Sequence, residues 1–97
     1  MSDLPRYHGE YKVPGGKLVV VDLHLKDDCF HQVHVSGDFF MEPPETLEAI
    51  NQALEGQPRH ASAEELTAAI QKVLDDEVMM YGITVAGVVT AIERALA

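Results

Sequence analysis

The sequence predicts an α+β fold in which an antiparallel three-stranded sheet carries about three helices on one face. Apolar residues alternate with period two in the first part of the chain and recur three and four residues apart in the second. Strands are therefore expected over roughly residues 7–40 and helices over roughly 44–96. The 97 residues are enough for a single domain, 1–97, with one modest hydrophobic core.

The clearest strand signal lies between Lys17 and Leu25. Every odd position from Val19 onward is apolar, whereas Asp22 and His24 fall on the opposite face. Because successive side chains of a strand point to opposite faces, this alternation is typical of a half-buried strand.

Two further strands flank this segment. After an acidic turn at residues 26–29, a strand is predicted from Phe30 to Phe40, closing on Gly37-Asp38-Phe39-Phe40. Residues 7–13 predict a shorter strand that ends at the Pro14-Gly15-Gly16 break.

The even-numbered face of this sheet mixes apolar and polar side chains. Its expected members are Leu18, Val20, Asp22, His24, Phe30, His34 and Phe40. A two-layer domain leaves one sheet face uncovered, so this face is a candidate docking surface. The alternative is that the N-terminal residues or a helix fold over it.

The second half predicts three helices. The first follows Pro43-Pro44 and ends before Gly56. Ser62 and Glu65 form a capping box at the start of the second, and Thr84 caps the third. The expected apolar stripe of the second helix comprises Leu66, Ile70, Val73 and Leu74.

Charge and composition exclude several classes of function. The net charge of −9 argues against nucleic acid and anionic membrane surfaces as partners. No apolar run reaches the roughly 20 residues that cross a bilayer, and the start of the chain lacks a secretion signal. The single cysteine, Cys29, fits a reducing compartment, so a cytoplasmic location is expected.

Charge is also distributed unevenly along the chain. The first 28 residues hold four of the seven cations and five acids, whereas the remainder holds three cations and eleven acids. Any contact with a phosphate would therefore involve the N-terminal third rather than the acidic remainder of the chain. Gly15 and Gly16 permit close approach of a phosphate or another chain, and Lys17 supplies a movable cation. The alternative is a tight turn followed by a solvated lysine.

The strand exit offers candidate contacts with a partner chain. The Asp38 carboxylate can accept backbone N–H groups at the strand end or bond across to a partner. By strand parity Phe39 packs under the helices and Phe40 lies on the open face, which makes Phe40 a predicted interface anchor. Val20 and His34 share that open face and complete the predicted interface.

Taken together, these motifs resemble the C-terminal accessory domain of lipoate-protein ligases, in the form in which it is a separate small subunit. The resemblance covers nearly the whole chain. It rests on Glu10-Tyr11-Lys12-Val13-Pro14-Gly15-Gly16-Lys17-Leu18, on the strand pair, on Gly37-Asp38-Phe39-Phe40 and on Tyr81-Gly82-Ile83-Thr84.

The resemblance implies a role in protein lipoylation within a heterodimer. A separate catalytic large subunit would activate lipoate with ATP to lipoyl-AMP and pass the lipoyl group to lipoyl-acceptor domains. The small subunit would assist activation more than transfer and is expected to be inactive alone. It would bind no cofactor by itself, while ATP, Mg²⁺ and lipoate would bind in the assembled complex. No nucleophile with an adjacent base is found in the sequence.

Two other functions have a basis in particular residues. The lipoate accessory domain resembles, in overall fold, scaffold and sulfur-acceptor proteins of iron-sulfur assembly. With Cys29 in the acidic turn, this resemblance implies a sulfur-carrier or iron-sulfur assembly module as the alternative, although acidic neighbours disfavour the thiolate. Of the five histidines, only His24 and His34 with Asp22, which the register places opposite His34, converge toward a metal. A polar cross-strand pair explains these residues without an ion, so no metal site is expected.

Overall fold

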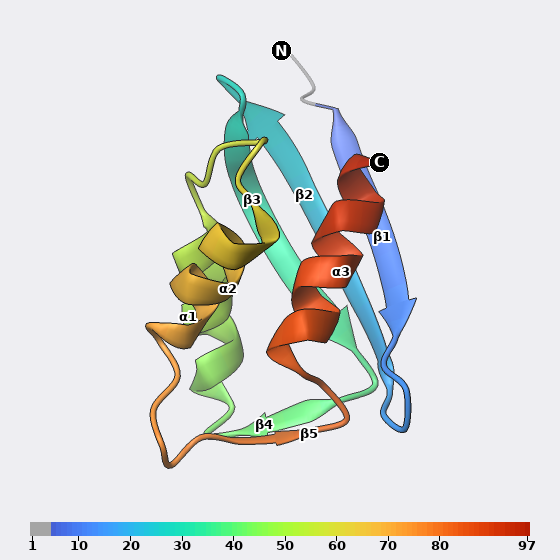
Figure 1. Cartoon of the computed structure of the whole chain (residues 1–97), viewed down its shortest axis with the longest axis vertical. Coiled ribbons are helices and arrows are strands. Elements are labelled where there is room, and N and C mark those ends of the chain that lie inside the picture. The colour runs from blue at the N-terminus through green and yellow to red at the C-terminus, as the bar shows by residue number, and fades with distance from the viewer. Residues whose placement is uncertain (1–4) are drawn as a thin grey trace.

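The structure is a computed structural model that describes residues 5–97 (Figure 1). These residues form five strands and three helices. In chain order they are β1 (Arg6–Lys12), β2 (Leu18–Lys26), β3 (Cys29–Gly37), β4 (Phe40–Glu42), α1 (Glu45–Leu54), α2 (Ala63–Gln71), β5 (Met79–Tyr81) and α3 (Val85–Leu96). Strands β1, β2 and β3 form an antiparallel sheet in that order, and the helices lie on one side of it. The predicted α+β fold is confirmed.

The sheet follows the expected pairing through its centre. Strand β1 pairs with β2 along its whole length, and Asp22 lies opposite His34. Asp27 and Asp28 turn the chain between β2 and β3 with φ angles of 53° and 64°. Aspartate tolerates this left-handed region better than most residues, which explains its use in the turn.

A bulge in β3 corrects the predicted position of Phe30. Between the pairs Asp22–His34 and His24–His31 the strand β3 contains one residue more than β2, and Gln32 has a φ of 54°. An extra residue reverses the facing of everything beyond it. Phe30 is therefore buried in the core instead of lying on the open face.

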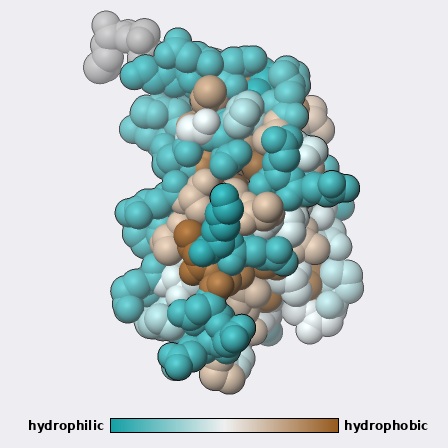
Figure 2. Space-filling model, turned by 60° about the vertical axis from the view of Figure 1, so that its left-hand side comes forward, coloured by the Kyte–Doolittle hydropathy of each residue, from teal (hydrophilic) through white to brown (hydrophobic). Residues whose placement is uncertain are grey.

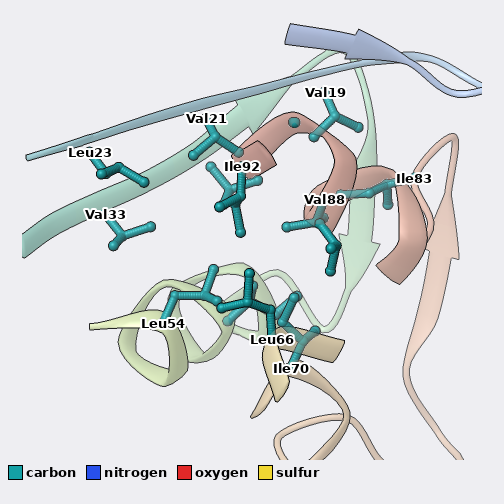
Figure 3. Packing of buried hydrophobic residues seen from close by; sticks show 14 of the residues in the cluster. Val19, Val21, Leu23, Val33, Leu54, Leu66, Ile70, Ile83, Val88 and Ile92 are labelled. Atoms are coloured by element: carbon teal, nitrogen blue, oxygen red, sulfur yellow. The ribbon is translucent and has the colours of Figure 1, made fainter. Parts of the chain in front are cut away.

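The hydrophobic core lies between the sheet and the helices. Val19, Val21 and Leu23 project from β2 toward Val88 and Ile92 of α3 (Figure 3). Leu54, Leu66 and Ile70 close the core from α1 and α2. The apolar residues of the alternating strands and those of the amphipathic helices thus form one cluster.

Strand β1 and helix α3 approach each other closely at Gly9. A Cβ atom on Gly9 would lie 2.2 Å from the Ala91 carbonyl oxygen and 2.4 Å from the Ala95 nitrogen. Arg94 of the same helix donates from Nη1 to the Glu10 carbonyl at 3.1 Å. The small residues at this crossing let α3 lie directly on the sheet.

Side chains of α1 and of its C-cap residue Glu55 cover the outer edge of β3. Asn51 Oδ1 accepts from the Val35 N–H at 3.0 Å, and the Glu55 carboxylate accepts from the N–H groups of Gln32 and Val33 at the bulge. Backbone groups freed by the bulge are thereby satisfied. A partner strand has no free donors to pair with at these positions.

The remaining strands form a feature that the sequence did not predict. Strand β3 ends at Gly37, and β4 pairs instead with β5 in a separate two-stranded ribbon. The ribbon runs across the end of the molecule opposite the β2–β3 turn (Figure 1). The prediction that Phe40 belongs to the open face of the main sheet is wrong, because Phe40 lies in β4.

The helix boundaries largely match their sequence signals. Ser62 and Glu65 form both hydrogen bonds of the capping box, and Thr84 accepts from the Gly87 N–H. Helix α2 ends at Gln71, so Val73 lies beyond it and is exposed, contrary to the predicted stripe. None of the helices in residues 5–97 combines the length and apolar character needed to cross a bilayer.

Candidate functional site

The predicted Gly15, Gly16 and Lys17 form the turn between β1 and β2, which we call the glycine turn. The turn is closed by a hydrogen bond from the Gly16 N–H to the Val13 carbonyl at 2.8 Å. The Lys17 N–H donates to the Gly82 carbonyl at 2.9 Å. This bond ties the glycine turn to the residue that follows β5, 65 positions further along the chain.

Gly82 also leaves the space that the Lys17 side chain occupies. A Cβ on Gly82 would lie 2.5 Å from Lys17 Cγ, and the φ of Gly82 is 82°. The lysine stem therefore lies against the Gly82 backbone. Within residues 5–97, no hydrogen bond or ion pair involves the Lys17 ammonium group, so its charge is available to another molecule.

Asp38 lies at the same end of the sheet. Its N–H donates to the carbonyl of Leu18 at 3.3 Å. Leu18 is the residue that follows Lys17. The Asp38 carboxylate has no hydrogen-bond or ion-pair partner in the described part of the chain. The strand exit is thus held by a backbone bond, and the carboxylate remains exposed.

Phe40 lies on the outer face of the ribbon, which we define as Phe40, Glu42, Met79 and Tyr81. Pairing of Phe40 with Tyr81 and of Glu42 with Met79 puts these four side chains on one side. Met41 is buried on the other side. Phe40, Met79 and Tyr81 are 58%, 55% and 40% exposed, and the two aromatic rings stack with centroids 4.6 Å apart.

A groove adjoins this outer face. It has a volume of about 400 Å³ and is lined by Phe39, Phe40, Met41, Glu42, Pro44 and Leu47. The lining residues come from β4, the residue before it and the start of α1. Apart from Glu42, the lining side chains are apolar.

The other two predicted interface residues lie elsewhere. Val20 and His34 are on the open face of the three-stranded sheet, where Val20 is half-buried and His34 exposed. All three helices lie on the opposite side, and residues 1–4, the other expected cover, lie outside the described residues. With Phe30 in the core and Phe40 in the ribbon, this open face is more polar than predicted.

A charged network occupies the open face between β1 and β2. Asp22 Oδ1 accepts from Arg6 Nη2 at 2.8 Å and lies 2.7 Å from His8 Nδ1. His8 Nε2 lies 2.7 Å from Glu10 Oε2. Ionised carboxylates only accept hydrogen bonds, so His8 makes both hydrogen bonds when its ring is protonated and both ring nitrogens donate. His34, although opposite Asp22, is not part of this network.

Two pKa values reflect the network. Hydrogen bonds to Glu10 and then Asp22 raise the pKa of His8 above its ordinary value. Partial burial alone would raise the pKa of Asp22, but hydrogen bonds from His8 and Arg6 outweigh burial and lower it. The charged forms of His8 and Asp22 are therefore stabilised by neighbours in the same chain.

The structure also places the residues considered for a sulfur-carrier function and for a metal site. Cys29 is half-buried, and its backbone pairs with Pro58, so the segment after α1 partly covers it. In residues 5–97 no group of three or more histidine, cysteine, aspartate or glutamate side chains is arranged to hold a metal ion.

Sequence reasoning missed two residues of this region. Met79 and Tyr81 belong to a three-residue strand, which is too short for its alternation to be recognised. Tyr81-Gly82 was singled out only through the family resemblance. A possible signal was the glycine at 82, because a glycine between a strand and a helix cap often marks a left-handed turn.

Comparison with known proteins gives one informative match. No protein-family model and no curated protein matches the chain. The fold is similar to that of a chain in a solved structure of an archaeal lipoylation system, a bi-partite lipoate protein ligase and its E2 lipoyl domain from Thermoplasma acidophilum. The TM-score is 0.67 at 23% sequence identity, over 95% of this chain and 97% of that chain. At this identity, the likeness establishes the fold.

Proposed function

We propose that this chain is the accessory subunit of a bipartite lipoate-protein ligase and assists ATP-dependent activation of lipoate to lipoyl-AMP by a separate catalytic subunit. The observation that carries the proposal is the convergence of three separate segments. The glycine turn, Asp38 and the Tyr81-Gly82 segment lie at one end of the fold, joined by the bonds of Lys17 to Gly82 and of Asp38 to Leu18. These are the segments on which the family resemblance rests.

The fold likeness to a chain of a bi-partite ligase system supports the same proposal. In this proposal Lys17 faces the nucleotide phosphates or the adenylate, since its ammonium group has no partner in residues 5–97. ATP, Mg²⁺ and lipoate bind in the complex instead of to this chain alone. Lipoyl-acceptor domains then receive the lipoyl group from the catalytic subunit.

Reconstitution tests the proposal. Each chain alone and both together are incubated with ATP, Mg²⁺, lipoate and an acceptor domain, and lipoyl-AMP and lipoylated acceptor are measured separately. We expect lipoyl-AMP only when both chains are present. A catalytic chain that forms lipoyl-AMP at full rate by itself, or turnover of ATP by this chain alone, would overturn the proposal.

A further inference from the structure

The outer face of the ribbon and the adjoining groove form an exposed apolar surface that the glycine turn does not explain. In Figure 2, apolar surface gathers at mid-height of one face and is bordered by hydrophilic residues, and the lower end, where the ribbon lies, carries both apolar and hydrophilic residues. Phe40, Met79 and Tyr81 are all more exposed than large apolar side chains usually are in a small domain. Clusters of this kind mark sites of association.

Contacts within the chain hold the side chains of this surface in place. Phe40 and Tyr81 face each other across the β4–β5 pair, and their rings are 21° from parallel. The Tyr81 hydroxyl donates to Met79 Sδ at 3.4 Å. Met41 anchors β4 in the core from the opposite side. Aromatic side chains held in place before binding lose little entropy when a partner docks.

The charge around the ribbon indicates the chemistry of the partner. Residues 27–58 and 73–93, which contain β4 and β5, include no lysine or arginine. Glu42 lines the groove, Asp38 and Glu45 flank β4, and acids at 75–77 precede β5. Apart from Lys17 beside Gly82, the charges near this apolar site are acidic, which is complementary to an apolar side chain flanked by cations.

From these observations we infer that the ribbon and groove dock the catalytic subunit through an apolar side chain flanked by lysine or arginine. This inference rests on the proposed function and adds the place and chemistry of the contact. It also explains how docking brings the catalytic chain to Lys17, because Tyr81 at the end of β5 is followed directly by Gly82, which binds the glycine turn.

A small acyl ligand is the competing occupant of the groove. Lipoate or octanoate has an apolar chain but also a carboxylate. That carboxylate would meet Glu42 in a groove that no cation lines, and the resulting repulsion disfavours it. The observations therefore favour a cationic protein surface.

Binding measurements with matched variants test the inference. The probe is the purified catalytic chain of the bipartite ligase, titrated calorimetrically into wild type, Phe40→Ala, Glu42→Lys and the control Val73→Ala. Val73 is 36% exposed and does not line the groove. We expect Phe40→Ala to weaken binding about tenfold or more, as for a central anchor. Glu42→Lys should weaken it about fivefold and reduce its salt dependence.

Melting temperatures identify any variant that fails to fold, and Tyr81→Ala then replaces Phe40→Ala as the test of the aromatic pair. Wild-type affinity in folded Phe40→Ala and Tyr81→Ala would overturn the inference. The proposed function would still stand if the catalytic chain formed lipoyl-AMP only in the presence of this chain. Failure of the wild-type chain to bind would end both. Titration with octanoate that fills the groove and blocks the catalytic chain would reassign the site to an acyl ligand.

Discussion

The open face of the sheet and the outer face of the ribbon are both exposed, but they differ in how their polar groups are satisfied. On the open face, Arg6, His8, Glu10 and Asp22 neutralise one another. At the ribbon end, the Lys17 ammonium and the carboxylates of Asp38 and Glu42 have no ion-pair partner among residues 5–97. Charges that are already paired, as in this network, gain little from a partner, whereas unpaired charges beside exposed aromatics favour one.

This difference redirects the predicted interface. Val20 and His34 were grouped with Asp38 and Phe40, but the structure places the first pair on the open face and the second at the ribbon end. The ribbon end combines apolar exposure with unpaired charge. We therefore expect it to carry most of the contact energy, and four predictions test the distinction.

The largest effect is expected at Gly9, where the three-stranded sheet that carries the open face meets α3. Gly9→Ala would drive a methyl group into the helix backbone, which we expect to lower the free energy of unfolding by about 3 kcal/mol. Gly15→Ala is the control, because its Cβ meets no atom within 4 Å and only its left-handed φ costs energy, about 1 kcal/mol. Denaturant unfolding of both variants gives the comparison. Equal losses of unfolding free energy in Gly9→Ala and Gly15→Ala would mean that α3 can move away from β1.

The next effect is expected in adenylation when Lys17 is changed. Lys17→Ala should slow lipoyl-AMP formation in the reconstituted complex about tenfold or more, as when one group that stabilises transition-state charge is lost. Stability should change by no more than about 0.5 kcal/mol, since the side chain is exposed. Association with the catalytic chain serves as the control and should persist. Wild-type adenylation by Lys17→Ala would leave the lysine as a solvated turn residue.

A smaller effect should follow from Gly82, which shapes the path of Lys17. Gly82→Ala and Gly56→Ala both place alanine at a φ near +80°, but only at Gly82 does the new methyl group meet Lys17. Both should lose about 1 kcal/mol of stability from backbone strain. Only Gly82→Ala should also slow adenylation, on the order of several-fold, because it displaces a positioned group.

A double variant separates the two explanations for Gly82. If Gly82 acts through Lys17, adding Gly82→Ala to Lys17→Ala should cause no further loss of adenylation rate. Independent, additive losses would instead assign Gly82 a role in the ribbon itself. Gly56→Ala should leave the rate unchanged in either case.

The sequence predicts the main sheet because its alternation is long and its apolar set is large. Val19, Val21 and Leu23 are fully buried as expected, and Ser62 and Glu65 cap α2 as expected. These features depend on residues that are close together in the sequence, so a single sequence is enough to predict them. The same parity rule failed at Phe30, since a single inserted residue at Gln32 reverses the facing of the strand beyond it.

The ribbon end could not be predicted because its contacts join distant segments. Phe40 and Tyr81 are 41 positions apart, and nothing in three-residue strands specifies their pairing. The bond between Lys17 and Gly82 spans an even longer separation. The family resemblance includes these segments, and their convergence became visible only in the folded chain.

The smallest effect concerns the paired charges of the open face, through the pH dependence of stability. Because the folded pKa of His8 is raised above its ordinary value of about 6.5, its stabilisation is fully present below that value and is lost as pH rises through the folded pKa. The unfolding free energies of wild type and His8→Gln should therefore converge as the pH rises above about 6.5. Because His8 is exposed, solvent screens the network and keeps the change small. Curves that stay parallel over this range would show that the open face is not held by His8, and the contrast with the ribbon end would lose its electrostatic basis.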